Sequence, residues 1–247
     1  MTAFQEFPKI ARYSRDCIVT EKIDGTNASV VIEEPDESAS VYDVMTGGVV
    51  AADRDRGLLM YAGSRTRHIT PEQDNHGFAR WVKENAETLW ALGPGRHFGE
   101  WWGSGIQRGY GLPKGEKRFS LFNVTRWALH GTPPLRIRTA DPRIEKYQDV
   151  LPPCVGLVPE LWRGQFDELF ASALLEKLAQ YGSQAAPGFM KPEGIVIFHV
   201  AGNYLFKKTI EKDTEPKSMA GSSKVERAAL AREVAGSSPA LPATFEE

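Results

Sequence analysis

Short apolar runs separated by polar turns dominate the first third of the chain. Residues 28–32 (ASVVI) and 58–61 (LLMY) are β-branched or apolar and lie between polar turns, which is typical of strands. Similar runs predict strands near 96–102 and 118–127, and a closing pair at 194–200 and 204–208 follows later in the chain. The pattern therefore indicates a chain rich in short strands.

Two longer segments have helical periodicity instead. Apolar side chains recur at helical spacing across residues 75–92, and Gly93-Pro94-Gly95 ends that segment. A second helix is predicted over residues 166–181, with Gly182 as its terminator. Strands and helices do not alternate regularly, which argues against a parallel doubly wound sheet. We therefore expect an α+β fold with mainly antiparallel sheets and flanking helices.

Composition divides the chain into two parts. The 247 residues are 41% hydrophobic and 10% aromatic, which suits one large folded domain. After about Thr214 the residues Ala, Ser, Gly and Pro take over, and aromatic residues nearly vanish. We predict a folded domain over residues 1–214 and a low-complexity, disordered tail over residues 215–247.

Several classes of protein are disfavoured by what the sequence lacks. No apolar run is long enough to span a bilayer, and the N-terminus has no basic region followed by an apolar one. Cys17 and Cys154 alone make no disulfide framework, so we expect a cytoplasmic protein without a membrane partner. The histidines show no metal-site spacing, and we expect the glycine-rich segment 103–109 to be a flexible loop rather than a dinucleotide site.

Net charge says little about a nucleic-acid partner. The formal charge is −2, so the field of the whole protein does not indicate nucleic acid. A local basic strip can nevertheless bind phosphates on a protein that is close to neutral. The charge therefore leaves an RNA partner open.

The first candidate for chemistry is Lys22, which ends an apolar stretch and begins a tight turn with Asp24 and Gly25. A lysine amine is a nucleophile when it is neutral, and burial and neighbouring cations favour that form. Gly25 would let the backbone approach a ligand closely. So short a motif recurs by chance, and an exposed turn is the alternative interpretation.

Two arginines follow the predicted strand at 58–61. Alternation along an extended strand would put Arg65 and Arg67 on one face. Adjacent guanidinium groups repel one another unless an anion lies between them, and phosphate is the natural candidate. The alternative is an exposed edge strand whose charges block aggregation.

Aromatic residues surround a carboxylate and fill the next strand. Glu100 lies in the run FGEWWG and is expected to be partly buried, so it needs a donor or a cation to stay ionised. A ribose hydroxyl would serve, and a structural pair with an arginine is the alternative. In the run FSLFNV, Phe122 or Phe119 would stack on a purine if it faced a cleft. A plain core strand is the alternative there.

The closing strand pair carries the last candidates. Glu193 begins one strand and is suited to hold a divalent cation through its oxygens. Lys207 and Lys208 are adjacent in the other strand, so they point to opposite faces and at most one enters a cleft. A solvated strand end is the alternative for this pair.

In chain order these segments resemble motifs I, Ia, III, IIIa, IV and V of the covalent nucleotidyltransferases, which include ATP-dependent ligases and mRNA capping enzymes. The run EKIDGTN over residues 21–27 is most similar to the branch of phage RNA ligase 2 and the kinetoplastid RNA-editing ligases. The resemblance extends from Glu21 to Lys208, and its strength lies in the joint order of motifs that are individually short.

The resemblance implies a ligase-type adenylyltransferase domain. Lys22 would attack the α-phosphate of ATP to give a lysyl-AMP, with Mg²⁺ or Mn²⁺ as the metal. The AMP would pass to an RNA 5′-phosphate, and a 3′-hydroxyl would then displace it. RNA with these two ends is therefore the expected partner. The catalytic residues implied are Lys22, Asp24, Lys207 and Lys208. The nucleotide-binding residues implied are Glu21, Asn27, Arg65, Glu100, Phe122 and Glu193, with Glu193 also the metal ligand.

The same resemblance suggests individual roles. Glu100 would bind the ribose, and Phe122 would stack on adenine, with Phe119 as the second choice. Arg65 would contact phosphate or the RNA end, and Asn27 would act in the later steps.

Two departures from the family pattern leave questions open. The family carries Lys-x-Lys where this chain has Lys207-Lys208, so the phosphate-binding lysine is not assigned. Little sequence follows Lys208, and we expect no OB-type barrel there, so a separate nucleic-acid clamp or a protein partner stays open. The alternatives are a nucleotidyltransferase with another acceptor, such as a DNA end or a capping-type substrate, and a non-catalytic RNA-binding module.

Overall fold

The computed structural model describes residues 7, 10, 12–35, 48–127 and 151–211. The chain divides into a unit of Met1–Glu211 and a second unit of Lys212–Glu247. The tail predicted over residues 215–247 lies outside the described residues.

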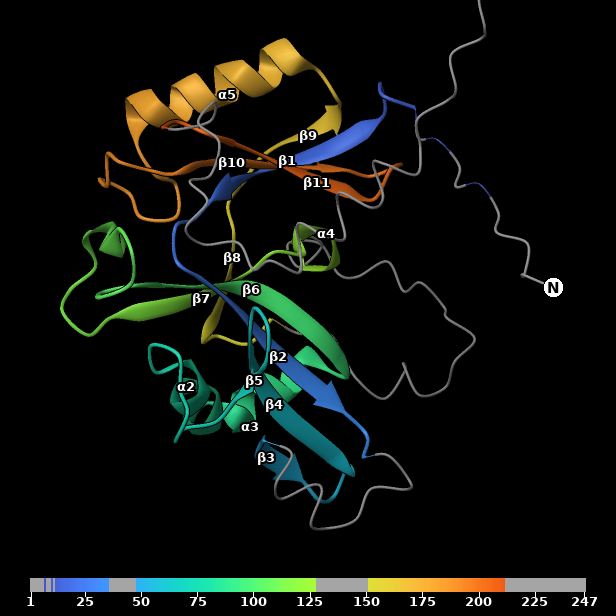
Figure 1. Cartoon of the computed structure of the whole chain (residues 1–247), viewed down its shortest axis with the longest axis vertical. Helices are drawn as coiled ribbons and strands as arrows, with labels where there is room; N and C mark the ends of the chain where they lie inside the picture. The colour runs from blue at the N-terminus through green and yellow to red at the C-terminus, as the bar shows by residue number, and fades with distance from the viewer. Residues whose placement is uncertain (1–6, 8–9, 11, 36–47, 128–150, 212–247) are drawn as a thin grey trace, which may run out of the picture. The chain divides into compact units, whose positions relative to one another are not determined.

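Two sheets form the framework (Figure 1). The smaller sheet has the order β11-β10-β1-β9, and all its neighbours are antiparallel. Its strands are β1 (Asp16–Lys22), β9 (Glu160–Gln165), β10 (Gly194–His199) and β11 (Tyr204–Thr209). The larger sheet has the order β3-β4-β2-β6-β7-β8, with β5 paired to β4. Its strands are β2 (Thr26–Glu33), β3 (Val49–Asp53), β4 (Leu58–Ser64), β5 (His68–Ile69), β6 (Gly95–Gly103), β7 (Lys117–Leu121) and β8 (Val155–Leu157). Among the described strands only the β7–β8 pair is parallel, so the predicted α+β class with mainly antiparallel sheets is confirmed.

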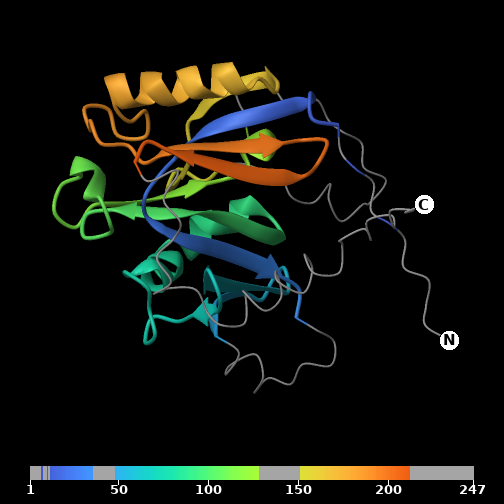
Figure 2. The same ribbon diagram turned by 45° about the horizontal axis from the view of Figure 1, so that its top comes forward.

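Helices cover the outer face of each sheet (Figure 2). Helix α5 (Glu168–Tyr181) packs on the smaller sheet, where Ala171 and Leu178 join the buried side chains of β1 and β10. It begins at Asp167, whose carboxylate accepts a hydrogen bond from the Phe170 amide, and ends at Gly182 with φ of 85°. The cap and the left-handed glycine explain why the sequence placed this helix well.

The predicted helix over residues 75–92 is three shorter pieces. These are α2 (Phe78–Glu84), α3 (Ala86–Leu89) and the 3₁₀ turn η1 (Trp90–Leu92). The break lies at Asn85, whose side-chain amide donates to the Trp81 carbonyl and whose φ of −106° is not helical. Asparagine competes in this way with the helical backbone bonds. The apolar face survives the break and packs on β2, β4 and β6.

The strand predicted over residues 118–127 is half right. Strand β7 ends at Leu121, and α4 (Val124–Trp127) follows it. The Asn123 side chain accepts a hydrogen bond from the Arg126 amide at 3.1 Å, which is the arrangement of a helix N-cap. The sequence did not reveal the switch from strand to helix, because the apolar run continues through both β7 and α4.

The chain crosses between the sheets twice, and both crossings lie beside each other. Residues 23–25 join β1 to β2, and Val158-Pro159 joins β8 to β9. The Glu21 amide donates to the Pro159 carbonyl at 2.9 Å, which ties the two crossings together. A separate cluster of buried side chains fills the space around them: Ile18, Ile23, Trp102, Tyr110, Val124, Val158 and Ala186.

We expect Gly99→Ala to destabilise the protein strongly for so small a change. A Cβ at Gly99 would overlap the Ser120 carbonyl oxygen and lie 2.7 Å from the ring of Phe119, both in the neighbouring strand. The cost of such overpacking is about 1–3 kcal/mol in the free energy of unfolding, measured by urea denaturation. Gly156→Ala is the matched control, since its Cβ would meet nothing nearer than 3.5 Å. Equal losses in the two variants would contradict this account of β6.

Candidate active site

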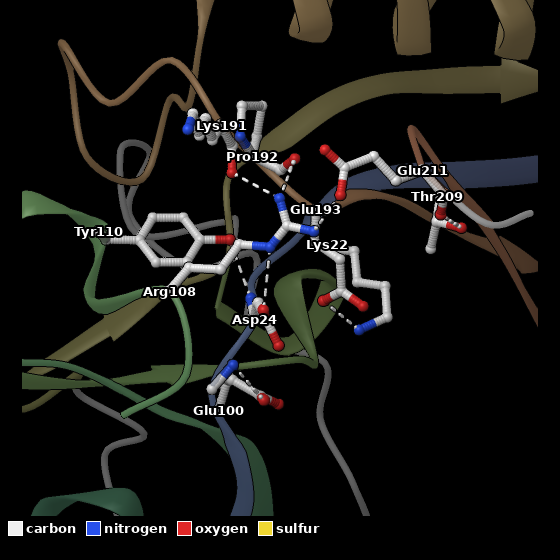
Figure 3. Close-up of polar contacts among 11 residues, drawn as sticks. Lys22, Asp24, Glu100, Arg108, Tyr110, Lys191, Pro192, Glu193, Thr209 and Glu211 are labelled. Carbon is white, nitrogen blue, oxygen red and sulfur yellow. Dashed lines mark hydrogen bonds and ion pairs between the residues drawn. The ribbon is translucent and has the colours of Figure 1, made fainter. Parts of the chain in front are cut away.

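The candidate site is centred on the pair of Lys22 and Glu193. Lys22 is the last residue of β1 and pairs with Gly194, the first residue of β10. Its Nζ lies 2.5 Å from Oε2 of Glu193, and the two side chains are 24% and 18% exposed. They are 171 positions apart in the sequence, and strand pairing brings them together (Figure 3).

The larger sheet contributes Glu100 from β6. Its Oε1 accepts a hydrogen bond from the Gly25 amide at 3.0 Å. A Cβ at Gly25 would lie 2.5 Å from the Trp101 carbonyl oxygen and 2.8 Å from the Cβ of Trp102, so only glycine allows this approach. Glu100 thus finds its donor in the turn that follows Lys22, and not in an arginine.

The electrostatics of Glu100 follow from its position. Burial is the main cause that raises the pKa of its carboxyl from the usual 4.5 to about 7, and the nearby carboxylates of Glu193 and Asp24 contribute to this rise. The Lys22 ammonium and the Gly25 amide oppose this rise but do not cancel it. A carboxyl with a pKa near neutrality in a cluster of charged groups is typical of a functional site.

The sheet register separates the two adjacent lysines. Lys207 pairs with Val196, which pairs with Thr20, and these three lie on the face of the sheet that carries Lys22. Lys208 pairs with Ile195 on the opposite face, under α5. Its Nζ lies 2.9 Å from the Glu168 carboxylate and 2.8 Å from the Ser172 hydroxyl. The structure thus places Lys207 on the Lys22 face and holds Lys208 against α5.

Glu21 does not fit the expected contact with nucleotide. It lies on the face opposite Lys22 and is 1% exposed. Its two oxygens accept hydrogen bonds from the Ser183 hydroxyl and from the amides of Gln184 and Ala185, at 2.5, 2.8 and 2.9 Å. The carboxylate therefore holds the segment after α5, and the assignment of its side chain to nucleotide is corrected.

The glycine-rich segment after β6 is anchored, contrary to the flexible loop that the sequence predicted. Ile106 and Tyr110 within it are 0% and 2% exposed. The Asp24 amide donates to the Tyr110 hydroxyl at 2.9 Å, and Arg108 Nε donates to Asp24 Oδ2 at 3.0 Å (Figure 3). Asp24 therefore contacts this segment through both its amide and its carboxylate. The bulky Ile106 and Tyr110 among the glycines were the signal in the sequence that indicated an anchored segment.

The register also orders the aromatic candidates. Phe119 is fully buried in the larger core, so it has no surface for a purine. Phe122 is 40% exposed, and its amide donates to the carbonyl of Phe98, which is 50% exposed. Phe98 and Glu100 are two positions apart in β6, so their side chains lie on the same face of the strand. Asn27 pairs with Glu100 in the neighbouring strand. Phe122, Phe98, Glu100 and Asn27 therefore border one surface.

Arg65 and Arg67 do not share a strand face as predicted. Strand β4 ends at Ser64, whose amide donates to the Arg67 carbonyl at 2.8 Å, so the chain turns between the two arginines. Arg67 donates to the Gln73 side chain, and Arg65 is exposed. Because Ser64 pairs with Ala28, Arg65 lies at the end of the sheet that carries Asn27.

The donor set fits a divalent cation only in part. Across residues 12–35, 48–127 and 151–211, no three His, Cys, Asp or Glu side chains are grouped as a metal site. Magnesium is commonly held by one or two carboxylates, with water and substrate phosphates completing its shell. Glu193 is suited to be one such ligand. Two cavities of about 370 and 360 Å³ lie beside α5 and at the β7–β8 edge, and neither is lined by Lys22, Glu100 or Glu193.

We expect the stability of the protein to fall from pH 5 to pH 8 because of Glu100. The folded protein binds the Glu100 proton up to about pH 7, whereas the unfolded chain releases it near 4.5. The stabilisation is therefore complete below 4.5 and is lost as the pH rises through 7. It amounts to at most about 3 kcal/mol. Urea denaturation at both pH values should show a smaller pH effect in Glu100→Gln, and an unchanged pH effect would contradict the raised pKa.

No curated protein matches this chain. Structures of the RNA ligase of Naegleria gruberi are similar, including a mutant with ATP and Mn at 18% identity and a TM-score of 0.48, and another with AMP and Mn at 16% and 0.47. Each covers 80% of this chain and 50% of the other, so the chain spans about half the length of these ligases. None of the described helices is long and apolar enough to cross a membrane.

The family comparison extends over most of the chain. A family model described as RNA ligase matches residues 15–209, a stretch that runs from the start of β1 to the end of β11. It includes the Lys22 turn, the β6 carboxylate and the closing strand pair described above. The chain therefore belongs to the RNA ligase family.

Proposed function

We propose that this protein is an ATP-dependent RNA ligase that forms a covalent lysyl-AMP at Lys22. One observation carries the proposal: Lys22, Glu193 and Glu100 converge from two sheets at the turn of residues 23–25. Membership of the RNA ligase family supports it.

In the first step the neutral Lys22 amine attacks the α-phosphorus of ATP. A nitrogen–phosphorus bond forms, the bond to the β-phosphate bridge oxygen breaks, and pyrophosphate leaves. Such a reaction depends mainly on positioning and on neutralising phosphate charge. Lys22 must first leave Glu193, with which it is paired in this structure. Mg²⁺ or Mn²⁺ would neutralise charge on the phosphate oxygens, and Glu193 would help to hold it.

The surrounding residues have complementary roles in the same step. Glu100 would accept a hydrogen bond from the ribose through Oε2, because Oε1 is the oxygen that accepts from the Gly25 amide. Phe122 would stack on adenine, since it is the exposed phenylalanine of the two candidates. Lys207 would contact the α-phosphate from the face that carries Lys22.

The later steps would use the end of the larger sheet that adjoins the turn of residues 23–25, where Asn27 pairs with Glu100. The lysyl-AMP would pass its AMP to the 5′-phosphate of an RNA, and a 3′-hydroxyl would then displace the AMP. Asn27 and Arg65 lie at this end of the larger sheet and are our candidates for contacts with the RNA end. Transfer to a DNA end or a capping-type substrate, and RNA binding without catalysis, are the competing functions.

We expect the wild-type protein to become labelled when it is incubated with α-labelled ATP and Mg²⁺ or Mn²⁺. The label should survive a denaturing gel, since it is held by a covalent bond. Lys22→Ala should abolish it, whereas Lys114→Ala, which removes an exposed lysine, should not. Labelled protein should then seal nicked RNA in preference to nicked DNA.

Each other outcome of this experiment identifies a competing function. Labelling followed by sealing of DNA alone would favour another acceptor. RNA binding by a folded protein that forms no adduct, and that is not already adenylylated when purified, would favour a binding module.

We expect Lys207→Ala and Lys208→Ala to separate catalysis from stability. Loss of Lys207 should slow lysyl-AMP formation by about 100-fold, because a charged donor to the transition state is removed. Loss of Lys208 removes a partly exposed contact with α5 and should cost less than about 1 kcal/mol in unfolding, with little change in rate. Rates at saturating ATP and urea denaturation measure the two effects. A larger loss of rate in Lys208→Ala would reverse the assignment.

A further inference from the structure

Arg108 connects four separate segments of the candidate site (Figure 3). Its Nε donates to Asp24 Oδ2 at 3.0 Å, and its Nη1 donates to the carbonyls of Lys191 and Pro192 at 3.0 and 3.4 Å. Its Nη2 donates to Glu211 Oε2 at 3.3 Å. Arg108 itself follows β6, the strand that carries Glu100. The side chains of Arg108 and Asp24 are each 27% exposed, whereas that of Glu211 is 64% exposed.

The contacts fall on both sides of the reactive pair. Asp24 lies two residues after Lys22, and Pro192 directly precedes Glu193. Pairing between β1 and β10 ends at Lys22 and Gly194, so beyond that point no ladder pairing joins the two turns to each other. Arg108 bridges them where the ladder stops. Its hydrogen bonds go to neither Lys22 nor Glu193, so its effect on them would pass through the backbone.

The local backbone supports a role beyond packing. Gln107 and Tyr110 flank Arg108 and have φ values of 43° and 51°, in the left-handed region that non-glycine residues rarely adopt. Such conformations persist only where the surroundings enforce them, and they cluster at functional sites. The Tyr110 hydroxyl accepts from the Asp24 amide, so the same segment grips Asp24 at two points.

We propose that Arg108 is a positioning residue that sets the Lys22 amine and the Glu193 carboxylate for adenylylation. It does so by holding the Asp24 turn against the Lys191-Pro192 segment. The role requires arginine, because its planar fork reaches a carboxylate and two carbonyls at once, whereas a lysine ammonium cannot span them. This inference rests on the proposed function of Lys22.

The test compares Arg108→Ala and Arg108→Lys with the wild type in single-turnover formation of lysyl-AMP. The maximal rate in Arg108→Ala should fall by about 100-fold, the effect of a displacement on the order of 1 Å at a reacting group. The ATP concentration that gives half the maximal rate should change by less than about 3-fold, since Arg108 does not bind nucleotide. Arg108→Lys should stay close to the alanine variant.

Arg163→Ala is the matched control. Arg163 is also a partly exposed arginine with a two-point contact, to the Glu160 carboxylate, but it lies in β9 away from Lys22. Its loss should leave the maximal rate within about 3-fold of wild type. Rates are expressed per folded molecule, with the folded fraction taken from thermal denaturation. A purely structural role for Arg108 would lower the folded fraction and leave this corrected rate unchanged, which would overturn the proposal.

A second readout does not depend on ATP. The rate at which acetic anhydride modifies Lys22, measured by mass spectrometry relative to Lys114, should change by about 3-fold or more in Arg108→Ala. If the wild type forms no adduct, the proposed function fails, and this measurement still decides whether Arg108 positions Lys22. If Arg108→Ala does not fold, Arg108→Lys takes its place in both measurements. Unchanged modification of Lys22 together with a wild-type adenylylation rate would overturn the inference.

Discussion

The close approach of Gly25 to β6 is the constraint on which the site depends. The chain leaves one sheet at Lys22 and enters the other at Thr26, so this connection is only three residues long. Gly25 must fit against Trp101 and Trp102 for its amide to reach Glu100. A side chain there would push the turn away and separate the lysine of one sheet from the carboxylate of the other.

This arrangement concentrates charge where water is scarce. Glu100 is buried enough for its pKa to approach neutrality, and Lys22 and Glu193 meet as a partly buried ion pair beside it. Taking these charged groups out of water is unfavourable and lowers the free energy of unfolding. The burial of apolar side chains in the cluster that includes Ile18, Trp102 and Tyr110 is favourable and offsets that cost.

Much of the fold could be read from local patterns. The strands at β2, β4, β6, β10 and β11 and the helix α5 follow apolar periodicity and end at turn residues, so their signals lie within a few neighbouring positions. The breaks at Asn85 and after Leu121 were missed, because a single side-chain bond to the backbone decided each one inside a continuous apolar run. The strands β8 and β9 were missed because their pairing partners, β7 and β1, are remote in sequence. The short strands β3 and β5 were missed although each pairs with the neighbouring β4.

The sequence by itself determined which residues are candidates for the proposed chemistry: a lysine before a glycine turn, a carboxylate among aromatics and a closing strand pair that carries Glu193 and two lysines. Only the tertiary structure decided which side of each strand faces that chemistry. Glu21 and Lys208 turned out to serve α5 and the segment after it, and Arg108 joined the site from a segment that composition alone described as a loop. The physical reason is that alternation fixes which residues share a face, whereas the packing of distant elements fixes what that face meets.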